Sequence, residues 1–249
     1  MPPASSAPPI DWKSLDALIA RVDEDRWISS RYAPERQRQA LIALYALNYE
    51  LARIRLVASE PALLAIRFQW WREELGAMDA PCTGPRHVVA SALKPLVGAG
   101  VFSGADLLEL ADRHQDAAEA QDRTLEPEGQ LARLAAGVLA PDWPFDGAID
   151  VVVGHFAAAR RGEPVEALPG EVGTGSPSGS ASRQGLEAAR RFYSRPRRYS
   201  SGHAPVRAPS SVLPALAHLA LRHNYRGARS PSAFRKRFIV LGAMVTGRL

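Results

Sequence analysis

Residues Arg38 to Met78 read RQALIALYALNYELARIRLVASEPALLAIRFQWWREELGAM, and this stretch decides the fold class. No proline interrupts Arg38–Glu60, which is rich in strong helix formers. Its apolar residues recur at helical spacing: Leu41, Leu44, Tyr45, Leu47, Leu51 and Ile54. Pro61 ends or resets this helix, and Ser59 can cap a second helix that runs to about Met78. A pair of helices with so wide an apolar stripe predicts the middle of an all-α domain.

Two segments of this stretch resemble the squalene/phytoene synthase family, whose enzymes join two isoprenoid diphosphates head to head. They are ALYALNYELARIR, residues 43–55, and SEPALLAIRFQWWREEL, residues 59–75. The amino-acid sequence of these segments is most similar to a branch that includes the mitochondrial complex I assembly factor and its bacterial relatives. The resemblance extends more thinly over most of the chain. It implies an all-α, isoprenoid-synthase-like helical bundle around a central cavity.

The first metal-binding motif of the active enzymes is missing. In those relatives two aspartates four residues apart share one helix face and bind the Mg²⁺ that holds the substrate diphosphate. Here the two positions hold Ala52 and Leu56, neither of which can ligate a metal. Arg53 and Arg55 beside them disfavour a cation further. The sequence therefore predicts no metal at this helix.

The segment VVVGHFAAARRGEPVEALP, residues 151–169, resembles the second signature region of the family. Arg160, Arg161 and Gly162 of its ARRG motif are retained, whereas the aspartate positions hold Gly154 and Ala158. The resemblance thus implies that the second metal site is lost as well. The former metal site is expected to be apolar, with a basic rim of arginines. These are Arg53, Arg55, Arg160 and Arg161.

The remaining carboxylates leave one alternative open. Asp112 and Asp116 are paired at i, i+4, and with Glu50 they are the only plausible substitute ligands for Mg²⁺. Solvated aspartates on a helix face are common, and His114 between them is expected to be packed or exposed rather than a ligand. The acidic run at residues 23–25 is interpreted as a solvated helix end.

Eight residues are candidates for binding a substrate or a partner, mostly because the resemblance points to them. They are Tyr45, Asn48, Arg53, Gln69, Trp70, Asp116, Arg160 and Arg161. Adjacent tryptophans on a helix point about 100° apart, so of Trp70 and Trp71 one can be core and the other a groove residue. The alternative is that both simply pack.

Composition bounds the remaining possibilities. A single cysteine excludes an internal disulfide framework, and a formal net charge of +5 favours acidic partners or an anionic membrane surface. We expect a disordered lead-in at residues 1–10 and one helical domain over 11–249, with a flexible, degenerate segment at 170–210 rich in glycine, serine and arginine. No nucleic-acid-binding motif surrounds those arginines, so no nucleic-acid partner is predicted.

The resemblance, together with the four missing aspartates, implies a non-catalytic binding or assembly factor rather than an enzyme, with no metal cofactor. The expected partners are an isoprenoid diphosphate or anionic lipid in the cavity, and a respiratory-complex subunit. The expected location is cytoplasmic, with peripheral contact at the inner membrane face as a variant. The alternative function is an active head-to-head prenyltransferase that forms squalene or phytoene with Mg²⁺.

Overall fold

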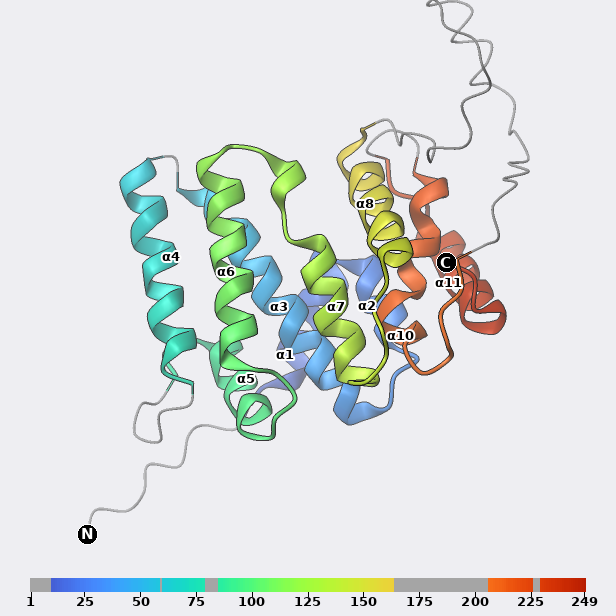
Figure 1. Cartoon of the computed structure of the whole chain (residues 1–249), viewed down its shortest axis with the longest axis horizontal. Coiled ribbons are helices and arrows are strands. Elements are labelled where there is room, and N and C mark those ends of the chain that lie inside the picture. Colours follow the sequence, from blue (N-terminus) through green and yellow to red (C-terminus); the bar gives the residue numbers. More distant parts are fainter. Residues whose placement is uncertain (1–9, 59, 79–84, 164–205, 226–228) are drawn as a thin grey trace, which may run out of the picture. The chain divides into compact units, whose positions relative to one another are not determined.

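The computed structural model of this chain describes residues 10–58, 60–78, 85–163, 206–225 and 229–249, and these ranges are helical without a β-strand (Figure 1). The all-α prediction is confirmed. The N-terminal helices are α1 (Trp12–Val22), α2 (Glu24–Ser30), α3 (Glu35–Val57) and α4 (Pro61–Gly76). The middle of the chain forms α5 (Val88–Gly98), α6 (Gly104–Glu119), the 3₁₀-helix η1 (Arg123–Leu125), α7 (Glu128–Leu139) and α8 (Gly147–Arg161). The C-terminal part forms α10 (Leu213–Leu216), the 3₁₀-helix η2 (Ala217–Asn224) and α11 (Ala233–Thr246).

Helix α3 lies at the centre and packs against α1, α5, α6 and α7. Every residue from Ala40 to Leu47 is buried, which fits a helix that is apolar on all sides and surrounded by others. The observed helix begins and ends three residues earlier than the predicted helix Arg38–Glu60. It begins at Glu35 because Pro34 occupies the N-cap position, and it ends at Val57 before Pro61 starts α4.

Helix α4 packs against α6 and α3 and lies at one edge of the view in Figure 1. Its buried face follows the predicted spacing, with Leu64, Phe68, Trp71 and Leu75 buried. The opposite face leaves Leu63 and Ile66 exposed. The predicted cap Ser59 lies outside the described residues.

Local capping explains several other helix starts. The Asp11 carboxylate accepts the Ser14 N–H at 3.1 Å and begins α1, while Ser103 does the same for α6 through the Ala105 N–H. Asp23 ends α1 and also caps α2. Gly162 ends α8 with a left-handed φ of 79°, so the glycine of the ARRG motif terminates the helix.

The C-terminal segment is less regular than the N-terminal helices. Residues 213–224 form one turn of α-helix and then the 3₁₀-helix η2, which packs on α8 and α11. Beyond it, α11 packs on η2 and α2. The predicted lead-in, apart from Ile10, and most of the segment 170–210 lie outside the described residues. Its end at 206–210 meets the C-terminus, where the Ala208 N–H donates to the Gly247 carbonyl at 2.9 Å.

No helix in the described ranges is both long enough and apolar enough to cross a membrane.

Candidate functional site

A buried ion-pair cluster occupies the region between α2, α7 and α8. Arg26 of α2 lies 2.5 Å from Asp23 and also binds Glu128 at the start of α7. Arg160 of α8 reaches the same Asp23 carboxylate at 3.2 Å. Two cations and two carboxylates thus neutralise one another, with Arg26 buried and the other three side chains partly exposed. Arg160, a predicted site residue, is a member of this cluster.

The charges of the cluster hold one another ionised. Burial alone would raise the pKa of Asp23, but Arg160 and Arg26 together bring that pKa well below its usual range. Burial opposes the charge on Arg26, and the carboxylates of Glu128 and Asp23 still raise its pKa. The pKa of Arg160 is raised chiefly by Asp23. Asp23, Arg26 and Arg160 therefore stay charged near neutral pH.

The acidic run at residues 23–25 is not a solvated helix end, and that interpretation was wrong. Asp25 is buried beneath α11, where Lys236 lies 2.7 Å from one carboxylate oxygen and the Tyr225 hydroxyl donates to the other. Glu24 binds the same lysine at 2.9 Å. The partner cations come from distant helices, so nothing in the local sequence shows that these carboxylates are enclosed.

Tyr45 and Asn48 of α3 lie against buried polar side chains. The Tyr45 ring is 5.8 Å from the Arg26 guanidinium, and the buried Tyr45 hydroxyl has no hydrogen-bond partner among the described residues. Asn48 Oδ1 is 2.9 Å from His114 Nε2. Burial lowers the pKa of His114 to about 3, with Arg55 and Arg26 adding to the effect, so the imidazole is neutral. His114 is therefore packed, which is one of the two outcomes expected from the sequence.

The four arginines expected to rim an empty metal site are each bound to a carboxylate. Arg55 lies 2.6 Å from Glu126, and Arg161 lies 2.6 Å from Glu163. Arg53 pairs with Glu50 at 3.2 Å. With Arg160 held by Asp23, these side chains do not form the open basic rim that the sequence predicts, because the fold supplies an internal anion for each.

The former aspartate positions are apolar and differ in exposure. Leu56 is 77% exposed, Gly154 is exposed, and Ala52 and Ala158 are half-buried. None of these four side chains offers an oxygen, nitrogen or sulfur ligand.

The substitute ligands do not meet in one metal-binding group. Asp112 is bound by Arg72 of α4 at 2.6 Å, Glu50 by Arg53, and Asp116 is exposed. Across the part of the chain that the structure describes, no group of three or more His, Cys, Asp or Glu side chains is placed to hold a metal ion.

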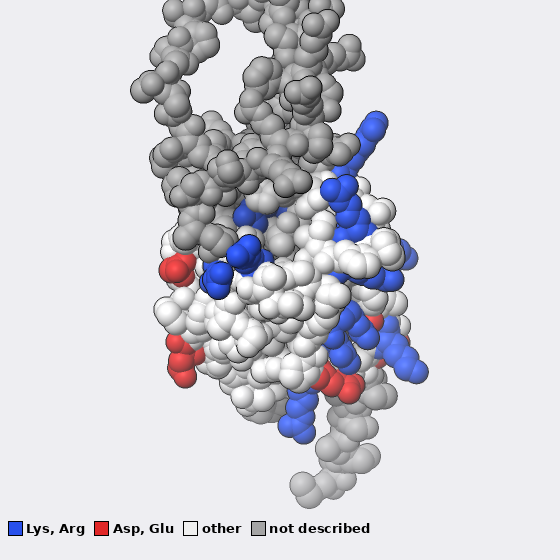
Figure 2. Space-filling model, turned by 90° about the vertical axis from the view of Figure 1, so that its right-hand side faces the viewer, with Lys and Arg blue, Asp and Glu red and all other residues white. Residues whose placement is uncertain are grey.

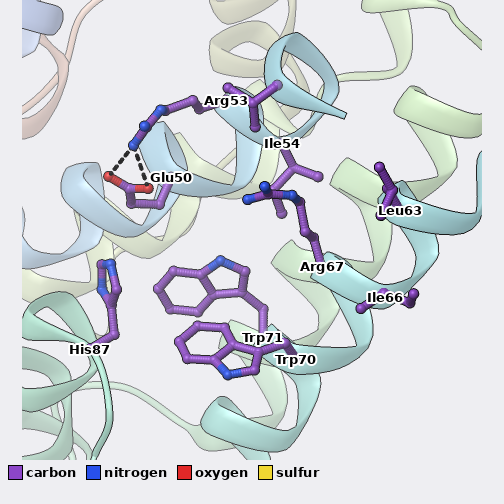
Figure 3. Close-up of a pocket in the computed structure, with 10 residues that line it drawn as sticks. Glu50, Arg53, Ile54, Leu63, Ile66, Arg67, Trp70, Trp71 and His87 are labelled. Carbon is purple, nitrogen blue, oxygen red and sulfur yellow. Dashed lines mark hydrogen bonds and ion pairs between the residues drawn. The ribbon is translucent and has the colours of Figure 1, made fainter. Parts of the chain in front are cut away.

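A groove lies between α3 and α4 (Figure 3). Its volume is about 450 Å³. The walls are mostly apolar, with Ile54 and Val57 from α3 facing Leu63 and Ile66 from α4. Such walls suit an elongated apolar ligand or an apolar segment of another chain.

Aromatic rings form the floor of this groove. Trp70 and Trp71 lie edge to face with 5.1 Å between ring centroids, and His87 lies edge-on to Trp71 at 5.0 Å. Trp71 is buried whereas Trp70 is half-buried, and both rings line the groove. Arg86 lies over the Trp70 ring and binds the buried Glu74 carboxylate at 2.8 Å, which ties the segment that precedes α5 to α4.

Two cations stand over these apolar walls. Arg53 pairs with Glu50 across the groove's α3 side, whereas Arg67 of α4 points toward α3 (Figure 3) and makes no ion pair with any residue that the structure describes. A guanidinium without an internal partner can bind carboxylate or phosphate through two parallel hydrogen bonds. The groove therefore combines an apolar surface with one available anion-binding side chain.

The structure divides the predicted site residues into three sets. Tyr45 contacts Arg26, and Arg160 binds the Asp23 carboxylate that Arg26 also binds. Asn48 lies against the buried His114, and Arg53 and Trp70 line the groove. Gln69 and Asp116 are exposed, and Arg161 pairs with Glu163. Sequence reasoning missed Asp23, Arg26, Glu128, Arg67 and His87 as site residues. Only Arg67 had a usable signal, since it stands in the RFQWW motif itself.

Comparison with known proteins gives one match. Residues 19–140 match the family described as squalene/phytoene synthase. The matched range includes Ala52 and Leu56 and ends before Gly154 and the ARRG motif. No significant match was found among curated proteins or among solved structures.

Proposed function

Because residues 19–140 of this chain match the squalene/phytoene synthase family, we propose that the chain is a non-catalytic member of this family that acts by binding. Catalysis in this family needs carboxylates that hold Mg²⁺ against the leaving diphosphate. Ala52 and Leu56 stand at two of the four positions, inside the matched range, and cannot supply them. Gly154 and Ala158 stand at the other two.

The single observation that carries this proposal is the saturation of the buried cluster. Asp23 and Glu128 are each bound by an arginine, and Arg160 is bound by Asp23. A diphosphate would have to displace a carboxylate to reach Arg26 or Arg160, leaving a buried charge unpaired. Breaking one buried pair in this way costs about 3–5 kcal/mol. The cluster thus acts as a structural tie between α2, α7 and α8.

Binding is assigned instead to the groove between α3 and α4. Its role would be that of an assembly factor, like the family branch that includes the complex I assembly factor, with a respiratory-complex subunit as the partner. An apolar segment of such a subunit fits against Ile54, Leu63 and Ile66, and one carboxylate on it can pair with Arg67. The retained RFQWW motif supports this placement, since Arg67 and both tryptophans line the groove.

Catalysis is tested with the purified chain, Mg²⁺, and farnesyl or geranylgeranyl diphosphate. We expect no diphosphate release above that of an identical sample with EDTA, while an active squalene synthase assayed in parallel releases it readily. Metal-dependent release at an enzyme-like rate would overturn the proposal. In that event, loss of the release in the double variant Asp112→Asn and Asp116→Asn would assign these residues as the substitute ligands.

Partner binding is tested with a photo-crosslinking amino acid at Ile66, in cells that assemble respiratory complexes. We expect a crosslink to a complex I subunit, and we expect it to weaken when Arg67→Glu is added. A matched control places the same amino acid at Val151, an exposed apolar residue of α8. Identical products from both positions, or no complex I subunit among them, would contradict the groove as the partner site.

A further inference from the structure

Helix α11 carries an unpartnered apolar face. Four large side chains on it are exposed: Phe234 at 72%, Phe238 at 60%, Leu241 at 45% and Val245 at 78%. Their spacing of four, three and four residues places them in one line along the helix. The two phenylalanine rings contact each other, with 4.7 Å between centroids. Exposed apolar lines of this length mark interaction surfaces.

The opposite, buried face of α11 fixes the orientation of the helix, so the line of apolar side chains faces outward. Lys236, Val240 and Ala243 are buried against the rest of the protein. Lys236 is held by Glu24 and Asp25 of α2, at 2.9 and 2.7 Å. The helix therefore cannot roll inward to hide the phenylalanines without breaking a buried ion pair.

Positive charge flanks the apolar line on both sides. At 100° per residue, Arg235 and Arg237 fall on either side of Phe238, and both are exposed. Arg229 and Arg248 are exposed beyond the two ends of the helix. Residues 229–249 contain no Asp or Glu. On this side of the molecule Lys and Arg border a broad uncharged surface, and acidic side chains are few (Figure 2).

We propose that α11 docks its apolar face flat on an anionic phospholipid bilayer. An amphipathic helix with aromatic residues on one side and arginines beside them lies in the plane of the interface, with its cations at the headgroups. A second copy of the chain is the less suitable occupant, because facing α11 helices would bring arginines together with no carboxylate from either helix to pair with them. This inference stands independently of the proposed lack of catalysis and of the groove.

The test is co-sedimentation of the full chain with vesicles. One set consists of phosphatidylcholine alone, and the other includes about one third phosphatidylglycerol. We expect binding to the anionic vesicles only, and we expect it to fall as salt is raised, since salt screens exposed charges. Phe234→Ser with Phe238→Ser should weaken binding by about tenfold or more, because both side chains leave water on docking.

A matched control removes two exposed apolar side chains that lie outside α11 and outside the groove. Leu125→Ser with Val151→Ser removes side chains of η1 and α8 and should leave vesicle binding unchanged. Arg235→Gln with Arg237→Gln should weaken binding and flatten its salt dependence. Because all these side chains are exposed, circular dichroism and melting temperature should match the wild type, which separates lost docking from lost folding.

Three results would overturn the inference. The first is that the folded wild type does not bind anionic vesicles. The second is that the phenylalanine variant binds as well as the Leu125→Ser, Val151→Ser control, which places any lipid contact elsewhere in the chain. The third is a phenylalanine variant that changes the oligomeric state in light scattering and leaves vesicle binding intact, which assigns the face to a second copy.

Discussion

Lys236 Nζ in α11 lies 2.7 Å from Asp25 Oδ1 in α2, and both side chains are almost fully buried, at 7% and 3% exposure. The Tyr225 hydroxyl, in the residue that follows η2, donates to the other oxygen of the carboxylate. Burial works against the charge on Lys236, but hydrogen bonds to Asp25 and Glu24 nevertheless raise its pKa. One carboxylate thus joins the N-terminal helices to the last helix of the chain.

The first prediction removes the cation of this pair. Lys236→Met leaves Asp25 buried with only the Tyr225 hydroxyl, and it should lower the free energy of unfolding by about 3–5 kcal/mol. The measurement is urea denaturation followed by circular dichroism. The control is Arg31→Gln, which breaks an exposed pair with Asp16 and should cost at most about 1 kcal/mol. Equal losses of unfolding free energy in the two variants would show that the buried Lys236–Asp25 pair stabilises the fold no more than the exposed pair does.

The second prediction concerns acid stability and His114. Burial lowers the pKa of its imidazole to about 3, from an ordinary value of 6.5 in the unfolded chain. Between these two values the unfolded state binds more protons, so the free energy of unfolding should fall as pH falls from about 6.5 toward 3. The contribution of this one residue reaches about 1.4 kcal/mol per pH unit.

Urea titrations at pH 7 and pH 5 check this slope. The variant His114→Gln cannot take up a proton and keeps an amide that can bond to Asn48. It should show a shallower loss between these two pH values than the wild type. The buried His218, whose pKa is lowered by burial and by Arg26, remains in both proteins and supplies part of the residual slope. An unchanged slope in the variant would contradict the assignment.

Features that depend on neighbours in sequence were predictable. The helical spacing of Leu41 to Ile54 gives the central helix to within three residues at each end. Asp11 and Ser103 act as caps because a cap needs only the next few residues. The buried face of α4 follows from the same periodicity.

Features that depend on distant partners were not predictable. Asp23 resembled a solvated charge because its partner Arg160 lies 137 residues away. The burial of Asp25 was not predictable for the same reason, because its partners Lys236 and Tyr225 lie in the C-terminal part of the chain. The groove escaped prediction because it depends on how α4 packs beside α3, with Ile54 buried and Ile66 exposed. The apolar pattern of either helix alone does not contain that information.

The third prediction addresses ligand binding in the groove. An isoprenoid diphosphate carries an apolar tail and an anionic head, the two features that the walls and Arg67 can accept. Because Trp70 and Trp71 form the floor, titration with farnesyl diphosphate should change the tryptophan emission and saturate. Arg67→Gln should raise the Kd by about tenfold, as expected for losing one charged hydrogen bond.

Matched controls show whether this signal comes from the groove. Arg113→Gln removes an exposed arginine of α6 that pairs with Glu109, and it should leave the Kd unchanged. Farnesol, which keeps the tail and lacks the diphosphate, should bind with similar affinity to the wild type and to Arg67→Gln. A Kd that is indifferent to Arg67→Gln would place the diphosphate at another site.

The last prediction is that millimolar Mg²⁺ leaves the melting temperature unchanged. Any ligand that binds only the folded state raises that temperature as its concentration rises. Ala52, Leu56, Gly154 and Ala158 offer Mg²⁺ no ligand, and Asp112 is already bound by Arg72 at 2.6 Å. The titration should be run at constant ionic strength, so that screening of surface charges does not mimic binding. Farnesyl diphosphate added without metal should still raise the melting temperature through Arg67. A rise with Mg²⁺ that disappears in the variant Asp112→Asn and Asp116→Asn would show that these two aspartates form a metal site after all, and the enzyme alternative would then be the better reading.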